Sequence, residues 1–147
     1  MTTSQSPTPV VPMGDEARSY WAKKGLERLR ETLNADAIIG NTVRVVLYVK
    51  TLPGEDPTPH FKQLRAKAVG RGWRVHSEIH DDTGKVQPAD SPAWNDLMQT
   101  LIGGTAQGVL APTFQHISLD HACYRDALYA IAEHRCFTSL LIPEPST

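Results

Sequence analysis

Cysteine and other signs of covalent or metal chemistry are scarce in this chain. Only Cys123 and Cys136 occur among its 147 residues, and they do not form a Cys-x-x-Cys pair. The His-Glu-x-x-His motif of many zinc enzymes is missing as well. Cys123 stands at an apolar position of an expected helix, and Cys136 lies next to an expected strand. We therefore predict reduced core cysteines, no metal site and no cofactor.

Long apolar runs and an excess of charge are also missing. No run approaches the roughly 20 residues of a membrane span, and the chain starts without a basic and apolar signal segment. The 15 Lys and Arg residues against 16 Asp and Glu give a formal net charge of −1. Proteins that grip nucleic acid through many phosphates usually carry a clear basic excess. We predict a cytoplasmic protein with no membrane partner and without strong nonspecific DNA binding.

The two ends differ in composition from the middle of the chain. Residues 1–12 and 143–147 are rich in Thr, Ser and Pro without apolar periodicity, which predicts disordered tails. Residues 13–41 are interpreted as one amphipathic helix, from Asp15 to Asn34 with Gly25 as its weak point, followed by a connector. The apolar face of this helix could pair with a partner or with a second copy. That face consists of Ala22, Leu26, Leu29 and Leu33.

The middle of the chain, residues 42–142, alternates between β-branched runs and helical periodicity. The predicted strands are residues 43–49, 73–79, 108–111 and 137–142. With a helix between each pair, this order predicts a three-layer α/β sandwich with a mostly parallel four- or five-stranded sheet, in a flavodoxin-like layout plus the N-terminal helix.

The three helices between these strands have recognisable starts and inward faces. Asp56 or Thr58 can cap the first, Ser91 with Pro92 opens the second, and Ser118 is expected to cap the third. The inward positions are Phe61, Leu64 and Ala68 in the first helix, Trp94, Leu97, Met98, Leu101 and Ile102 in the second, and Cys123, Ala127, Leu128 and Ile131 in the third.

Four short segments in this region resemble sequence motifs of one protein family. The run from Tyr48 to Leu52 stands where that family writes Tyr-x-Arg-Val-Ser, and a Gly-Trp pair ending at Trp73 leads into the second strand. Residues 81–84 resemble its Asp-x-x-Gly loop, and residues 91–97 resemble its Arg-Pro-x-x-x-x-Leu helix start. The chain thus resembles the N-terminal catalytic domain of serine recombinases, the resolvases and invertases. The resemblance implies a resolvase-like domain over residues 42–142.

The same resemblance places other residues where the family has its catalytic groups. Leu52 occupies the position of the serine nucleophile, and a leucine has no oxygen with which to attack a phosphodiester. No arginine lies between Arg74 and Arg125 to bind the phosphate. We therefore expect no catalytic residue and no recombinase activity. The family's arginines are replaced here by Lys50, Ser91, His116 and Leu119.

A cleft is expected beyond the carboxyl ends of the strands, because ligands of open parallel sheets bind there, at the point where strand order reverses. Segments 50–55 and 112–118 are predicted to form it. A Ser-His-Asp assembly of Ser118, His116 and Asp120 is conceivable, but the role of Ser118 as a helix cap is the simpler one. The cleft candidates are Lys50, Thr51, Asp82, His116 and Ser118.

Two further groupings have ordinary explanations. His76 and His80 stand four apart on an expected strand and share a face, but two imidazoles alone do not make a metal site. A basic stretch could bind phosphates, yet it also fits the solvated face of a helix and its exit. This stretch comprises Lys62, Arg65, Lys67, Arg71 and Arg74.

These observations lead to one main hypothesis and two alternatives. We expect a catalytically inactive recombinase-like domain that acts in the cytoplasm as a protein-binding or regulatory module, with a protein partner or a second copy as its ligand. In the first alternative the basic stretch makes it an accessory DNA-associated regulator. In the second, the cleft binds a small molecule or catalyses new chemistry with His116 as acid or base.

Overall fold

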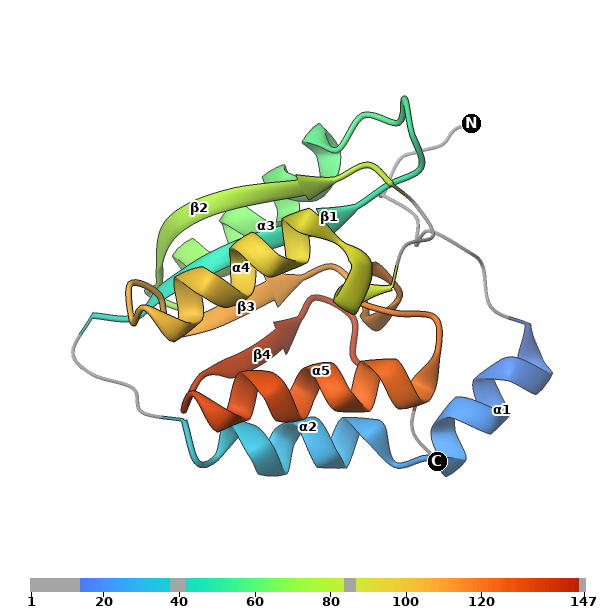
Figure 1. The fold of residues 1–147 in the computed structure, drawn as a ribbon. Helices are drawn as coiled ribbons and strands as arrows, with labels where there is room; N and C mark the ends of the chain where they lie inside the picture. Colours follow the sequence, from blue (N-terminus) through green and yellow to red (C-terminus); the bar gives the residue numbers. More distant parts are fainter. Residues whose placement is uncertain (1–13, 38–41, 84–86, 146–147) are drawn as a thin grey trace.

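A parallel sheet forms the centre of the fold. The computed structural model describes residues 14–37, 42–83 and 87–145. Its strands are β1 (Arg44–Lys50), β2 (Arg74–Asp81), β3 (Gly108–Ala111) and β4 (Phe137–Leu140), and they pair in the order β2-β1-β3-β4 (Figure 1). All three pairings are parallel. The α/β class and the predicted strands are confirmed within a few residues at their ends.

Helices cover both faces of this sheet and make three layers. α3 (Thr58–Gly70) lies on one face, while α4 (Pro92–Ile102) and α5 (His121–Glu133) lie on the other (Figure 1). β1 is buried on both sides, so it needs an almost unbroken apolar run. Its alternate residues divide between two clusters: Val45, Leu47 and Val49 pack toward α3, and Val46 and Tyr48 pack toward α4 and α5.

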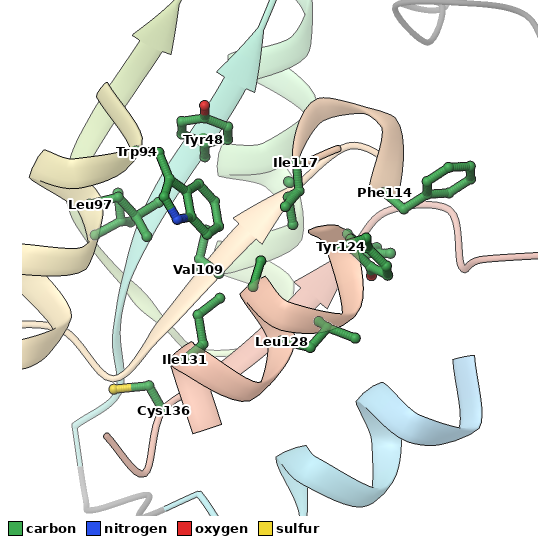
Figure 2. Close-up of a cluster of buried hydrophobic side chains, with 14 of the residues drawn as sticks. Tyr48, Trp94, Leu97, Val109, Phe114, Ile117, Tyr124, Leu128, Ile131 and Cys136 are labelled. Atoms are coloured by element: carbon green, nitrogen blue, oxygen red, sulfur yellow. The ribbon is translucent and has the colours of Figure 1, made fainter. Parts of the chain in front are cut away.

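The larger cluster lies under α4 and α5. Figure 2 shows Tyr48 beside Trp94, and their ring centroids are 5.2 Å apart in an edge-to-face arrangement. Ile117, close to the 3-10 helix η2 (Phe114–His116), closes the carboxyl end of this cluster and is fully buried. A second short 3-10 helix, η1 (Pro88–Asp90), leads into α4. These two turns bring the loops after β2 and β3 over the ends of the strands.

The N-terminal region forms two helices, so the prediction of one continuous helix is wrong. α1 (Asp15–Lys23) and α2 (Leu26–Asn34) are separated at Gly25, whose φ of 65° lies in the left-handed region that glycine adopts without strain. Trp21 anchors α1, because its ring lies 3.9 Å from that of Phe114 and 5.8 Å from that of Tyr124, measured between centroids.

The apolar face of this region packs against the chain's own core in this structure, which differs from the expectation that it faces a partner or a second copy. α2 lies beside α5 (Figure 1). Leu26 is 2% exposed, and Leu29 and Leu33 pack against the core cluster, while Ala22 of α1 is half-buried. Burial against the chain's own α5 satisfies the hydrophobic stripe that the sequence left without a target.

The C-terminal segment corrects a third prediction. Glu144 was expected in a disordered tail, but it is 3% exposed and accepts hydrogen bonds from Arg30 and Tyr124. Residues 146–147, and the tail predicted for residues 1–12, lie outside the described residues. Within the described residues, no helix is both long and apolar enough to cross a membrane.

Most of the predicted inward residues are buried, with three exceptions. Met98 is half-buried and packs against the larger core cluster. Ile102 is 49% exposed at the end of α4. Cys123 is half-buried, because Tyr124, with no exposed surface, takes the inward position in that turn of α5. Cys136 is buried as predicted.

Of the three predicted helix caps, the one at Ser91 is confirmed and the other two differ. Ser91 caps α4 and accepts a hydrogen bond from the Trp94 amide at 3.1 Å. Asp56 accepts from the Thr58 amide at 3.0 Å, although the residue at the cap position of α3 is Pro57. Ser118 does not cap α5, because Asp120 does so by accepting from the Cys123 amide at 3.0 Å.

Candidate functional site at the carboxyl end of the sheet

The two segments predicted to form a cleft lie side by side at the ends of β1 and β3. The Lys50 amide donates to His116 Nδ1 at 3.0 Å, and Lys50 Nζ donates to the Ile117 carbonyl at 3.4 Å. Lys50 and Thr51 are 3% and 2% exposed, His116 has no exposed surface, and Ser118 is 2% exposed. The predicted juxtaposition is therefore confirmed, but the side chains fill the space between the strand ends.

Asp81, the last residue of β2, is the centre of a hydrogen-bond network at this end. Its Oδ2 accepts from Tyr48 Oη at 2.9 Å and from Ser91 Oγ at 2.6 Å. Its Oδ1 accepts from the Thr83 amide at 3.0 Å and from the Thr83 hydroxyl at 2.5 Å. Both carboxylate oxygens are thus satisfied, although Asp81 is only 2% exposed.

The charges at the site follow from burial and this network. Burial opposes ionisation of Asp81, but the hydrogen bonds from Ser91, Thr83 and Tyr48 outweigh it and lower the pKa of the carboxyl below its ordinary value. Burial, together with the adjacent Asp81 charge, raises the pKa of the Tyr48 hydroxyl. Burial also lowers the pKa of Lys50, and Asp81 counteracts this shift. The site is therefore built around one stable internal carboxylate.

Asp82, which the sequence analysis selected for the cleft, is exposed and takes no part in the network around Asp81. The sequence does mark Asp81, because it is the first residue of the Asp-x-x-Gly motif. Tyr48 and Ser91 likewise stand at motif positions. What the sequence could not show is that three motifs converge on one carboxylate.

His116 completes the hydrogen bonding of a strand end. β3 pairs with β1 only as far as Leu47, so the Lys50 amide finds its acceptor in the His116 ring. Burial, with smaller contributions from the positive charges of His60 and Lys50, lowers the pKa of His116 to about 3. With Nδ1 engaged and no exposed surface, His116 is placed as a structural acceptor and not as an accessible acid or base.

His116 Nε2 lies against another histidine. Because Nδ1 of the neutral ring accepts a hydrogen bond, the proton is on Nε2. This atom and His60 Nδ1 are both buried without a hydrogen-bond partner among the described residues. The two rings meet edge to face with centroids 5.0 Å apart. A protonated Nε2 cannot bind a metal, so this pair does not form a metal site.

The other polar candidates form separate pairs. Ser118 Oγ donates to Gln87 Oε1 at 2.7 Å and accepts from the Asp120 amide at 3.1 Å, so it is not joined to His116 as a catalytic assembly would require. Thr51 Oγ1 lies 2.7 Å from His80 Nε2.

The two strand histidines do not act together. The sequence analysis placed His76 and His80 on one face of β2. The register shift between Val45 and Val46 inserts His76 as an extra residue and breaks the alternation on which that prediction rested. No group of three or more potential metal ligands occurs among the described residues.

Two leucines occupy the surface of this end. Leu52 follows β1 and is 39% exposed, and Leu119 precedes α5 and is 42% exposed. These are the positions at which the resemblance places the nucleophile and one of the arginines. Both positions are apolar and exposed at the carboxyl end of the sheet.

The basic stretch runs along α3 and into the start of β2. Arg65 is neutralised by Glu78, which accepts from Nε at 2.5 Å and from Nη2 at 2.7 Å. Arg71 lies over the Trp73 ring at 5.3 Å. Lys62 and Arg74 are exposed, and Lys67 is half-buried. The stretch is therefore a real surface feature with part of its charge already compensated.

Neither a protein-family model nor a curated protein sequence matches the chain. Among solved structures, it is similar to the C-terminal catalytic domain of ISC1926 TnpA, an IS607-like serine recombinase, with 13% identity and a TM-score of 0.61 over 69% of this chain and 72% of that one. It is also similar to the N-terminal catalytic domain of TP901-1 integrase, with 20% identity and a TM-score of 0.58 over 67% of this chain and 78% of that one. The chain therefore has the fold of a serine recombinase catalytic domain.

Proposed function

We propose that this domain is a catalytically inactive, recombinase-like module that binds another protein. One observation carries the proposal, namely the burial and exposure of the residues that stand where the resemblance places catalytic groups. Lys50, Ser91 and His116 are buried and hydrogen bonded within the fold, whereas Leu52 and Leu119 are exposed. The polar side chains at this end hold the domain together, and the side chains at its surface suit an apolar contact.

Attack on a phosphodiester at this site lacks both a nucleophile and an accessible cation. Leu52 has no hydroxyl group, and the neighbouring hydroxyl of Thr51 is buried beside His80. Lys50 is 3% exposed, and its ammonium group lacks the planar fork with which arginine binds phosphate. The proposal therefore assigns no catalytic residue to this chain.

The charge around the two leucines indicates the chemistry of the partner. The described loop residues at this end, 51–57, 82–83, 87–91 and 112–120, contain no Lys or Arg; Lys85 of the same loop region lies outside the described residues. Such a surface repels phosphates and attracts basic groups. We expect a protein segment with an apolar anchor flanked by Lys or Arg. The exposed carboxylates belong to Glu55, Asp56, Asp82, Asp90 and Asp120.

Affinity capture from a lysate of the native cells tests the proposal. The full chain is compared with Leu52→Asp, Leu119→Asp and the matched control Val69→Asp, which alters an apolar residue of α3 that is 77% exposed. We expect one protein to be retained by the wild type and by the control and lost with both leucine variants. If all four chains retain the same proteins, or if only nucleic acid is recovered, the proposal is wrong.

A DNA-associated role is the second candidate, favoured by the exposed cations Lys62 and Arg74. Fluorescence anisotropy with a short labelled duplex at low salt tests it. Binding that disappears in the double variant Lys62→Glu, Arg74→Glu supports this role, because phosphate contacts depend on such charges. The absence of binding by the wild type at low salt excludes it.

A further inference from the structure

The outer edge of β4 is occupied by a side chain where a further strand could pair. Asn34 of α2 donates from Nδ2 to the Thr138 carbonyl at 2.7 Å and accepts from the Thr138 amide at its Oδ1 at 2.9 Å. A carboxamide carries the same donor and acceptor as a peptide unit. In a hydrogen-bonded antiparallel pair of strands, one residue likewise donates to and accepts from the backbone of the residue opposite. Asn34 therefore substitutes for a strand at this edge.

A second set of contacts fastens α2 in this position. Arg30, one helical turn before Asn34, donates to the Thr138 carbonyl at 3.3 Å and to Glu144 Oε2 at 2.8 Å. The Tyr124 hydroxyl donates to the same Oε2 at 2.5 Å. Glu144 thus joins α2, α5 and the segment that follows β4. We call the three residues Arg30, Tyr124 and Glu144 the tail lock.

The tail lock is incompletely satisfied. Glu144 Oε1 is buried without a partner among the described residues, which costs free energy in the closed state. Solvent-open pockets border α2 on two sides, one lined by Gly25, Arg28 and Pro145 and the other by Asn34, Trp73 and Phe137. Water therefore reaches both flanks of the helix.

We infer that α2 is a releasable cover over the edge of β4, held by the tail lock and able to open while the sheet stays folded. In the open form the Thr138 amide and carbonyl lose their partners in α2, and the outer edge of β4 is unpaired. α2 is joined to β4 through the side-chain hydrogen bonds of Asn34 and Arg30 and not through a strand ladder, so its opening would leave the pairings of the sheet intact.

Amide hydrogen exchange of the full chain, followed by NMR, tests this inference with two variants that weaken different parts of the fold. Glu144→Gln weakens the tail lock, and Leu97→Ala weakens the core under α4 without touching α2. We expect the amides of residues 26–34 and of Thr138 to exchange faster than those of residues 45–49 in the wild type. In Glu144→Gln their exchange is expected to rise about tenfold or more. If that variant does not fold, Asn34→Ala removes the edge contacts in its place.

The decisive result comes from Leu97→Ala. If α2 opens while the sheet and α4 stay folded, the contacts of Leu97 are not broken in that opening, so the exchange of α2 and Thr138 should change by less than about twofold while the β1 amides speed up strongly. If Leu97→Ala accelerates α2 and Thr138 as much as β1, the helix opens only when the whole domain unfolds, and the inference is wrong.

Discussion

Two buried carboxylates in this fold each accept a hydrogen bond from a buried tyrosine, but they are satisfied in opposite ways. Asp81 has donors on both oxygens, from Tyr48, Ser91 and Thr83. Glu144 takes both of its donors on Oε2, and its Oε1 has no partner in the described part of the chain. The same chemical pair therefore makes a closed network in one place and an incomplete one in the other.

The difference corresponds to what each carboxylate holds. The Asp81 network joins the ends of β1 and β2 to the start of α4, all of them parts of the central sheet and its cover. The Glu144 network joins α2 to α5, to β4 and to the segment that follows β4. A complete network suits the closed carboxyl end of the sheet, whereas an incomplete one fits the release of α2 that we infer.

The largest effect is expected from Asp81→Ala. This change leaves the Tyr48, Ser91 and Thr83 hydroxyls without their acceptor in a buried place, so the free energy of unfolding should fall by about 4 kcal/mol. Urea denaturation followed by circular dichroism measures it. A loss below about 1 kcal/mol would show that the network contributes little and would remove the contrast with Glu144.

Acid should weaken the Asp81 end through its neighbour His116. An unfolded histidine binds a proton as the pH falls below about 6.5, whereas folded His116 does so only near its pKa of about 3. Stability is therefore lost as the pH falls from about 6.5 toward 3, by about 3 kcal/mol at pH 4.5. His116→Gln keeps an acceptor for the Lys50 amide and should flatten most of this slope. The remainder is expected from His60, whose pKa burial also lowers, and, below about pH 4, from Asp81, whose pKa the hydrogen-bond network lowers.

Glu144→Gln should cost less than Asp81→Ala. The glutamine oxygen can still accept from Tyr124 and Arg30, but the Arg30 guanidinium, 9% exposed, loses its counter-charge. We expect the free energy of unfolding to fall by about 2 kcal/mol in the same urea experiment. An equal or larger loss than in Asp81→Ala would reverse the ranking of the two carboxylates.

Leu52→Asp is expected to have the smallest effect on stability. Leu52 is 39% exposed and does not belong to either core cluster, so the free energy of unfolding should change by no more than about 0.5 kcal/mol. Thermal unfolding with Val69→Asp as control checks this. A clear destabilisation confined to Leu52→Asp would mean that the side chain supports the fold and would weaken its use as a marker of the binding surface.

Some of the candidate site followed from the sequence because motif residues stand at strand ends. Lys50, Thr51, His116 and Ser118 do lie together, since the carboxyl ends of β1 and β3 are adjacent. The sequence analysis selected Asp82, whereas the structure places Asp81 in the network, because the last residue of a strand and the first of a loop cannot be separated by composition. The role of His116 was missed because it depends on where β3 ends relative to β1.

The sequence by itself determined the α/β order and the strands, because apolar periodicity and β-branched runs depend on local spacing. It also determined the absence of a nucleophile at Leu52. Only the tertiary structure decided that α2 covers the edge of β4, that Gly25 divides the N-terminal helices and that Glu144 is buried. Each of these depends on contacts between residues about 100 positions apart or on one backbone angle, and neither leaves a periodic trace in the chain.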